Sequence, residues 1–246
     1  LFLMVDFDGT LCPIVKRPAL AKLDKVTKRV LERLQKNRKV LVAVISGRSL
    51  KDVKSKVGIK GIIYAGNHGL EISGPGIKFL HKEAAKTRAR FDSIDKKLKS
   101  ALRSIPGLLV EHKGLTASIH YRLVRKGDLA RMHRLVRKVL DEHKRSGRIS
   151  VFPGKKVYEI RPPVRWNKGR AVNWLLNHHK GLRRNVLAIY IGDDRTDEDA
   201  FHALRKKGIT VRVGDPAKRS LAQYYLKDTR DVSKFLNQLH LNLGEI

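Results

Sequence analysis

Short apolar runs rich in valine and isoleucine are the feature that most constrains how this chain can fold. Runs of this length, bounded by polar residues or glycine, are typical of strands buried on both faces of a sheet. Apolar residues recur at helical spacing between them, from Leu23 to Leu34 and from Ala171 to Leu175. The alternation predicts an α/β fold, a Rossmann-like core with a mostly parallel sheet and helices on both faces. The runs are Leu1–Val5, Val40–Ile45, Ile62–Ala65, Val186–Ile191 and Ile209–Val213.

The middle third of the chain has a different pattern, in which two long helical stretches alternate with two pairs of short strands. Because apolar residues occupy only one face of these strands, we expect an antiparallel sheet covered on one side by two helices. We interpret this part as an α+β domain, residues 74–164, inserted between core segments 1–73 and 165–246. The turns at Gly74–Gly76 and Pro162–Pro163 would mark its ends. The helical stretches are 91–105 and 129–140, and the strands are 108–113, 116–122, 149–152 and 157–161.

The charge balance is strongly positive, with 54 lysines and arginines against 23 acidic residues, a net charge of +31. Such a field attracts polyanions. The basic residues are spread along the whole chain and form no tract interleaved with aromatic residues of the kind that recognises RNA. We therefore expect any binding of nucleic acid to be non-specific.

Two further features concern the compartment. The single cysteine, Cys12, excludes an internal disulfide framework and favours a reducing, cytoplasmic location. No apolar run approaches the roughly 18 residues that a membrane span needs, so we expect no membrane association.

Polar residues follow three of the predicted strands directly. Asp6 and Asp8 follow the first, Ser46 follows the second, and an acidic segment that begins at Asp193 follows the fourth. Ligands bind at the carboxyl ends of strands in open α/β sheets, so these residues would meet if the strands are neighbours. Asp6 and Asp8 point to the same side of an extended segment and would repel one another without a cation. A turn explains Asp8 with its following glycine, but not Asp6.

Five of the 23 acidic residues fall between positions 193 and 199. A helix N-terminus favours acidic side chains, which accounts for Asp197, Glu198 and Asp199. It does not explain Asp193 and Asp194 at the end of the strand. A hard divalent cation such as Mg²⁺, which prefers oxygen ligands, does explain them.

Ser46 and Lys168 each allow two interpretations when taken alone. Ser46 could hold a phosphate together with backbone N–H groups, or it could cap a helix that begins near Leu50. Lys168 could hold a phosphate, although a lone lysine is usually a solvated surface residue. The case for both residues depends on their combination with the aspartates.

In combination, the four motifs resemble those of the haloacid dehalogenase superfamily of phosphatases, in the same order along the chain. The motifs are Asp6–Thr10, Ser46, Lys168 and Gly192–Asp194, and the inserted domain is similar to the C2-type cap of that superfamily. Within the superfamily, the chain is most similar to the trehalose-6-phosphate phosphatase family. Further strings that carry this resemblance are Gly66–Glu71, Val110–Gly114, His120–Arg122 and Glu159–Pro162.

The resemblance implies a Mg²⁺-dependent phosphatase with an aspartyl-phosphate intermediate. Asp6 would be the nucleophile and Asp8 the acid and base, while Ser46 and Lys168 would hold the phosphoryl oxygens. The implied metal site comprises Asp6, the backbone carbonyl of Asp8, and Asp193, with Asp194 and Asp197 in support. The implied substrate-binding residues are Thr10, Gly47 and Arg48 in the core and Glu111, Lys113, His120, Arg122 and Glu159 in the cap.

Several substrates are compatible with this interpretation. Trehalose 6-phosphate is the expected one, and sucrose 6-phosphate and mannosyl-3-phosphoglycerate are the alternatives within the class. A polyanion-binding or nucleic-acid-binding protein that reuses the fold is the alternative from another class. We expect a monomer acting on a small sugar phosphate.

Overall fold

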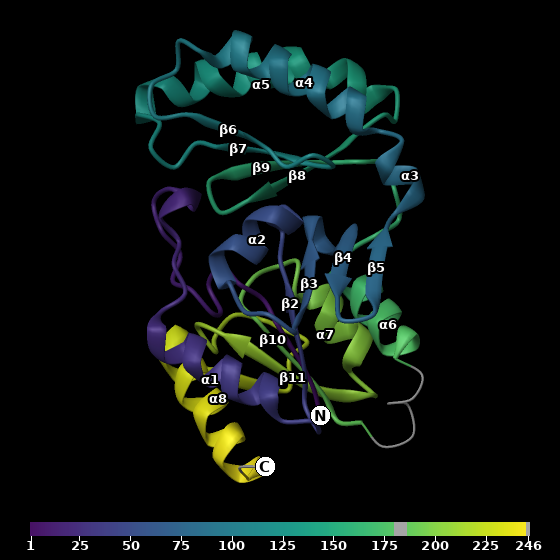
Figure 1. Ribbon diagram of the computed structural model, residues 1–246. Helices are drawn as coiled ribbons and strands as arrows, with labels where there is room; N and C mark the ends of the chain where they lie inside the picture. Colours follow the sequence, from purple (N-terminus) through teal and green to yellow (C-terminus); the bar gives the residue numbers. More distant parts are fainter. Residues whose placement is uncertain (180–185, 245–246) are drawn as a thin grey trace. The chain divides into compact units, whose positions relative to one another are not determined.

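The computed structural model describes residues 1–179 and 186–244, and the chain forms two compact units (Figure 1). Unit 1 comprises Leu1–Phe79 and Trp166–Ile246, and unit 2 comprises Leu80–Arg165. The predicted α/β class, with a mostly parallel sheet, is confirmed by the topology of unit 1.

Unit 1 contains an eight-stranded sheet in the order β12-β11-β10-β1-β2-β3-β4-β5. The strands from β12 to β3 are parallel, and β4 pairs antiparallel with β3. From β1 the chain adds β2 and β3 on one side and later β10, β11 and β12 on the other, so the strand order reverses at β1. The strands are β1 (Phe2–Val5), β2 (Leu41–Ile45), β3 (Ile63–Gly66), β4 (Glu71–Gly74), β5 (Ile77–Leu80), β10 (Ala188–Gly192), β11 (Gly208–Val213) and β12 (Tyr224–Leu226).

Helices cover both faces of this sheet, and alternate residues of each strand pack against opposite helix layers. Leu3 and Val5 of β1 join the core beneath α1, α2 and α8, whereas Phe2 and Met4 join the core beneath α6 and α7. This explains why the strands are apolar on both faces. The helices are α1 (Lys25–Lys36), α2 (Leu50–Val57), α6 (Lys168–His178), α7 (Glu198–Leu204) and α8 (Thr229–Leu243), with short 3-10 turns η1 (Pro18–Leu20) and η2 (Asn67–Gly69).

Side-chain caps define where several of these helices begin. Asp24 accepts hydrogen bonds from the backbone N–H groups of Val26 and Thr27, both at 2.9 Å, at the start of α1. Asn167 accepts from the N–H of Arg170 at 2.9 Å and so defines the start of α6. Each such cap contributes about 1 kcal/mol to stability, and the Asn167 cap also sets the position of Lys168.

The turn at Gly74–Gly76 lies within unit 1, where it connects β4 to β5. We expected this turn to mark the passage into the inserted domain, but the division between the units falls after Phe79. The β4–β5 extension of the large sheet was not predicted, because its strands are short and carry few of the valine and isoleucine residues that distinguish the others.

Unit 2 contains a four-stranded antiparallel sheet in the order β6-β7-β9-β8. Helices α4 and α5 lie side by side over one face of it, and Ala117, Ile119 and Ile160 join their core (Figure 1). The elements are α3 (Lys82–Ala85), α4 (Arg88–Leu102), β6 (Leu109–His112), β7 (Ala117–His120), η3 (Lys126–Asp128), α5 (Leu129–Arg145), β8 (Ser150–Gly154) and β9 (Val157–Arg161). Within residues 1–179 and 186–244, no helix combines the length and apolar character that crossing a membrane would require.

Gly69 and Gly76 make a matched pair for testing the packing of unit 1, since both have left-handed backbone conformations, with φ of 89° and 67°. A Cβ at Gly69 would lie 2.2 Å from the Cβ of Ala171 in α6, whereas no atom of the residues that the structure describes lies within 4 Å of one at Gly76. We expect Gly76→Ala to lower the free energy of unfolding by about 1 kcal/mol, and Gly69→Ala to cost about 1–3 kcal/mol more because it overpacks the core. Urea denaturation measures both changes, and equal losses would contradict the packing argument.

Candidate active site

The candidate site lies at the carboxyl ends of β1, β2 and β10, where the strand order of the sheet reverses. The backbone N–H of Asp6 donates to the carbonyl of Ile191 at 2.9 Å, so the end of β1 lies beside the end of β10. Parallel α/β sheets place their ligand sites at such a point. Asp6 after β1 and Asp193 after β10 therefore meet, as we expected, and Ser46 follows the neighbouring strand β2.

Lys168 joins parts of the chain that lie far apart in the sequence. It is the first residue of α6 and is buried, and its Nζ lies 2.7 Å from Oδ1 of Asp6 and 2.7 Å from Oδ1 of Asp197. Both carboxylates are also buried. The interpretation of Lys168 as a solvated surface residue is therefore wrong.

Asp197 organises the loop after β10. Its Oδ1 accepts from Lys168 and from the hydroxyl of Tyr190 at 2.7 Å. Its Oδ2 accepts from the backbone N–H groups of Asp193 and Asp194, both at 3.0 Å. Because both oxygens already have partners, Asp197 supports the loop that carries Asp193.

The electrostatics of this cluster follow from its burial. Burial, opposed by Lys168 and reinforced by neighbouring carboxylates, raises the pKa of Asp6 well above its ordinary value. The same balance raises the pKa of Asp197 to about 7. Burial alone would lower the pKa of Lys168, but Asp197 and Asp6 raise it well above its ordinary value. Lys168 therefore keeps its positive charge between the two carboxylates.

Asp194 closes a turn in the same loop. Its Oδ1 accepts from the backbone N–H of Thr196 at 2.8 Å and from the Thr196 hydroxyl at 2.7 Å. Burial opposes ionisation of this carboxyl, but Lys168 and these hydrogen bonds lower its pKa to about 2. Like Asp197, Asp194 holds the loop in shape.

The chemistry of the donors fits a hard cation. Carboxylate oxygens of Asp6, Asp193 and Asp197 all lie within 4.8 Å of one another. The Asp193 carboxylate packs against Gly9, where a Cβ would lie 2.3 Å from its Cγ, so only glycine lets it approach the loop after β1. Three buried carboxylates without sulfur or imidazole ligands match the preference of Mg²⁺ for oxygen. Asp6 and Asp193 are the residues best placed to hold it, since the oxygens of Asp197 are already engaged.

Ser46 is buried after β2, and its Oγ accepts from the backbone N–H of Arg48 at 3.2 Å. The interpretation of Ser46 as a helix cap is wrong, because Ser49 caps α2 by accepting from the N–H of Asp52 at 3.2 Å. Gly47 packs against the imidazole of His68. Ser46 and Gly47 therefore belong to the turn at the end of β2.

Arg48 is 5% exposed, and carboxylates of the protein occupy the guanidinium nitrogens that a phosphate would need. Its Nε and Nη2 each lie 2.7 Å from one oxygen of Asp8, and its Nη1 lies 2.5 Å from Oδ2 of Asp52. The implied role of Arg48 as a substrate ligand conflicts with this geometry, because its planar fork is already paired with Asp8. Thr10, on the same loop as Asp8, is fully buried, and its hydroxyl has no hydrogen-bond partner among the described residues.

Three of the substrate-binding residues expected in the inserted domain, Glu111, His120 and Glu159, lie on the sheet face of unit 2 opposite the helices, and Lys113 directly follows β6. Strand register places Glu111, Ser118 and Glu159 directly across from one another on β6, β7 and β9. Glu111 lies 2.9 Å from His120 and 3.9 Å from Lys113, and Glu159 lies 2.5 Å from Arg161. Arg122 lies beyond the end of β7, so the predicted strand over 116–122 is too long. It donates to the carbonyl of Lys155 at 3.1 Å.

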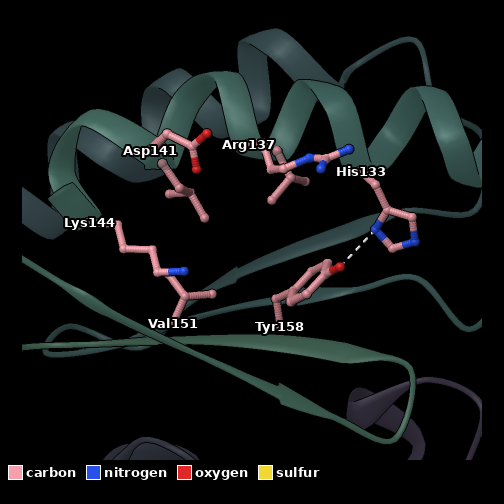
Figure 2. Close-up of a pocket in the computed structure, with 8 residues that line it drawn as sticks. His133, Arg137, Asp141, Lys144, Val151 and Tyr158 are labelled. Atoms are coloured by element: carbon pink, nitrogen blue, oxygen red, sulfur yellow. Dashed lines mark hydrogen bonds between the residues drawn. The ribbon is translucent and has the colours of Figure 1, made fainter.

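Unit 2 also has a pocket on the helix side of its sheet, with a volume of about 370 Å³. Figure 2 shows His133, Arg137, Asp141 and Lys144 on α5 above the strand residue Tyr158, whose hydroxyl hydrogen-bonds Nδ1 of His133 at 2.8 Å. None of these residues was among those expected to bind substrate. The pocket is therefore separate from the polar face that carries Glu111 and Glu159.

Sequence reasoning missed two residues that support the site. Tyr190, which donates to Asp197, lies in the middle of a buried apolar strand, where a tyrosine hydroxyl needs a partner. Asp52, which pairs with Arg48, stands four residues after it, the separation at which helical residues pair. Either signal could have identified them.

The buried position of Lys168 has a testable consequence for stability. Lys168→Met would leave the Asp6 and Asp197 carboxylates buried without their cation, so we expect the metal-free protein to lose about 3 kcal/mol of unfolding free energy. Lys86→Met is the control, because Lys86 pairs with Glu83 at 2.7 Å with both side chains exposed. Urea denaturation with a chelator present measures both, and we expect no measurable change in the control. Similar losses in the two variants would contradict the argument.

Comparison with known proteins agrees with this geometry. Residues 4–230 match the trehalose-phosphatase family. Among its relatives, probable trehalose-phosphate phosphatases D and E of Arabidopsis thaliana are 34% and 37% identical, each over 96% of this chain. The chain spans 66% and 69% of their respective lengths, or about two thirds.

A solved structure supports the same assignment. The C-terminal domain of trehalose-6-phosphate phosphatase from C. albicans has a TM-score of 0.82 at 26% identity, with 97% of this chain and 91% of that chain covered. The family match extends through the ends of β1, β2 and β10 and through the whole of unit 2. This chain therefore belongs to the trehalose-phosphatase family.

Proposed function

We propose that this protein is a Mg²⁺-dependent phosphatase that hydrolyses trehalose 6-phosphate through an aspartyl-phosphate on Asp6. The observation that carries the proposal is the buried cluster in which Lys168 lies 2.7 Å from Asp6, next to a set of carboxylates suited to a hard cation. Phosphoryl transfer needs mainly positioning and charge stabilisation, which such a cluster can supply.

The first step in this proposal transfers the phosphoryl group to the protein. A carboxylate oxygen of Asp6 attacks phosphorus, and the bond from phosphorus to the sugar oxygen breaks. Asp8 donates a proton to the departing sugar oxygen. Ser46 and Lys168 hold the phosphoryl oxygens through the hydroxyl and the ammonium group. Bound Mg²⁺, held by Asp6, Asp193 and the carbonyl of Asp8, would offset the repulsion between carboxylate and phosphate.

The second step releases phosphate. Asp8, now ionised, accepts a proton from a water molecule that attacks the phosphorus of the aspartyl-phosphate, and the bond to Asp6 breaks. The buried position of Asp6 supports this role, because a dry site protects the intermediate from uncontrolled hydrolysis. Asp194 and Asp197 act through the loop that carries Asp193.

We propose further that unit 2 is the cap domain of this phosphatase and that its polar sheet face binds the sugar. Glu111, Lys113 and Glu159 offer charged hydrogen-bonding groups on that face, and His120 pairs with Glu111. Charged side chains suit sugar hydroxyls because each hydroxyl can both donate and accept. Arg122 is a weaker candidate in this proposal, since it lies beyond the strand.

Replacing the proposed nucleophile is the primary test. Asp6→Asn keeps the size of the side chain but removes its nucleophilic oxygen, so we expect turnover to fall by a factor on the order of 10⁴ or more. Phosphate release is measured with and without Mg²⁺ for trehalose 6-phosphate, sucrose 6-phosphate and mannosyl-3-phosphoglycerate. Full activity of Asp6→Asn would refute the proposed mechanism, and preference for either alternative substrate would refute the proposed specificity.

Glu159→Ala tests the role of the polar face. Loss of one charged hydrogen bond to the sugar should raise KM for the sugar phosphate by about tenfold or more, while KM for a small phosphate ester without a sugar stays unchanged. Glu142→Ala, which removes an exposed acid from α5 in the same unit, is the control. Unchanged KM for the sugar phosphate in Glu159→Ala would remove this residue from the substrate site.

A further inference from the structure

The guanidinium of Arg48 forms a two-point contact with Asp8, the proposed acid and base. Nε lies 2.7 Å from Oδ2 of Asp8, and Nη2 lies 2.7 Å from Oδ1. Such a fork fixes the plane of a carboxylate as well as its position. Asp8 itself follows β1 in a loop and is only partly buried, so its own burial does not determine its orientation.

The guanidinium is in turn held from two other elements. Nη1 lies 2.5 Å from Oδ2 of Asp52 in α2, and Nη2 donates to the carbonyl of Pro18 at 3.0 Å. Arg48 also lies over the ring of Phe7, at 5.3 Å from its centroid. The arginine is thus fixed from three sides before it reaches Asp8.

We propose that Arg48, held by Asp52, is the positioning residue that sets the orientation of the Asp8 carboxylate for proton transfer. This inference rests on the proposed function, in which Asp8 protonates the leaving sugar oxygen. The fork uses one lone pair on each oxygen of Asp8, and a carboxylate offers about four such sites. Asp8 can therefore carry or accept a proton while Arg48 holds it.

The competing interpretation is an ion pair that only ties the loop after β1 to α2. Lys56 separates the two interpretations, because its Nζ donates to the carbonyls of Ala19 and Ala21 at 3.0 and 3.1 Å. It therefore ties the same loop to the same helix without touching Asp8. Lys56→Met is a matched control for Arg48→Lys.

The test compares two phosphate esters that differ in how much they need an acid. A sugar alkoxide is a poor leaving group and needs a proton, whereas 4-nitrophenolate leaves without one. In single-turnover experiments with Mg²⁺, we expect Arg48→Lys to slow release of the sugar by about ten- to a hundredfold. Release of 4-nitrophenol should change far less, so the ratio of the two rates is the measured quantity.

Asp52→Asn is the second variant. It removes one contact of the guanidinium but keeps the arginine, so the test does not depend on whether Arg48→Lys folds. It should shift the ratio of the two rates in the same direction by a smaller factor, and Lys56→Met should leave the ratio as in the wild type.

A second measurement, made without Mg²⁺, follows the ¹⁵N-correlated NMR signal of the Arg48 Nε–H. Asp8→Asn should move this signal, and Lys56→Met should not.

The outcomes separate the two proposals. Equal slowing of both esters in Arg48→Lys and Asp52→Asn, or an unchanged rate for both, overturns the positioning role while the phosphatase proposal stands. The same shift of the ratio in Lys56→Met also overturns it, because tethering of the loop would then suffice. If the wild type hydrolyses neither ester, or Asp6→Asn keeps full activity, the proposed function fails and this inference fails with it.

Discussion

The buried ion triad of Asp6, Lys168 and Asp197 is the constraint on which the rest of the site depends. A charge removed from water is costly unless a partner and hydrogen bonds compensate it. The compensation here requires that the end of β1, the first turn of α6 and the loop after β10 meet within hydrogen-bonding distance. Asp197 then uses its second oxygen to hold the loop that carries Asp193. One cluster therefore couples folding of unit 1 to assembly of the site.

The same physical rule recurs at Asp8 and in unit 2. Arg48 is buried but lies between two carboxylates, so its charge is compensated within the protein. In unit 2, one face of the sheet packs on α4 and α5 and the other carries paired charged residues, among them Glu111 and Glu159. In both units, acidic side chains of this basic chain therefore pair with cationic side chains that are buried or half-buried.

The sequence predicted several residues of the candidate site because apolar runs show where the buried strands end. Asp6, Ser46 and Asp193 each follow an apolar run, and parallel strands bring their carboxyl ends to one edge. The sequence left a choice open where two residues could play the same local role. Ser46 and Ser49 are both suitable caps for α2, and only the backbone shows that Ser49 takes the role. The β4–β5 extension was missed because short, mixed strands carry a weak pattern.

Sequence by itself determined the fold class and the chemical character of the site, because hydrophobic periodicity and residue type are local properties. Tertiary structure alone decided which partner each charge has. Lys168 and Asp6 are 162 residues apart, and no local pattern can pair them. Likewise, Arg48 could have faced a phosphate or an aspartate, and the choice depends on the placement of Asp8, Asp52 and Pro18 around it. Charges interact through space, so their roles emerge only once the chain has brought them together.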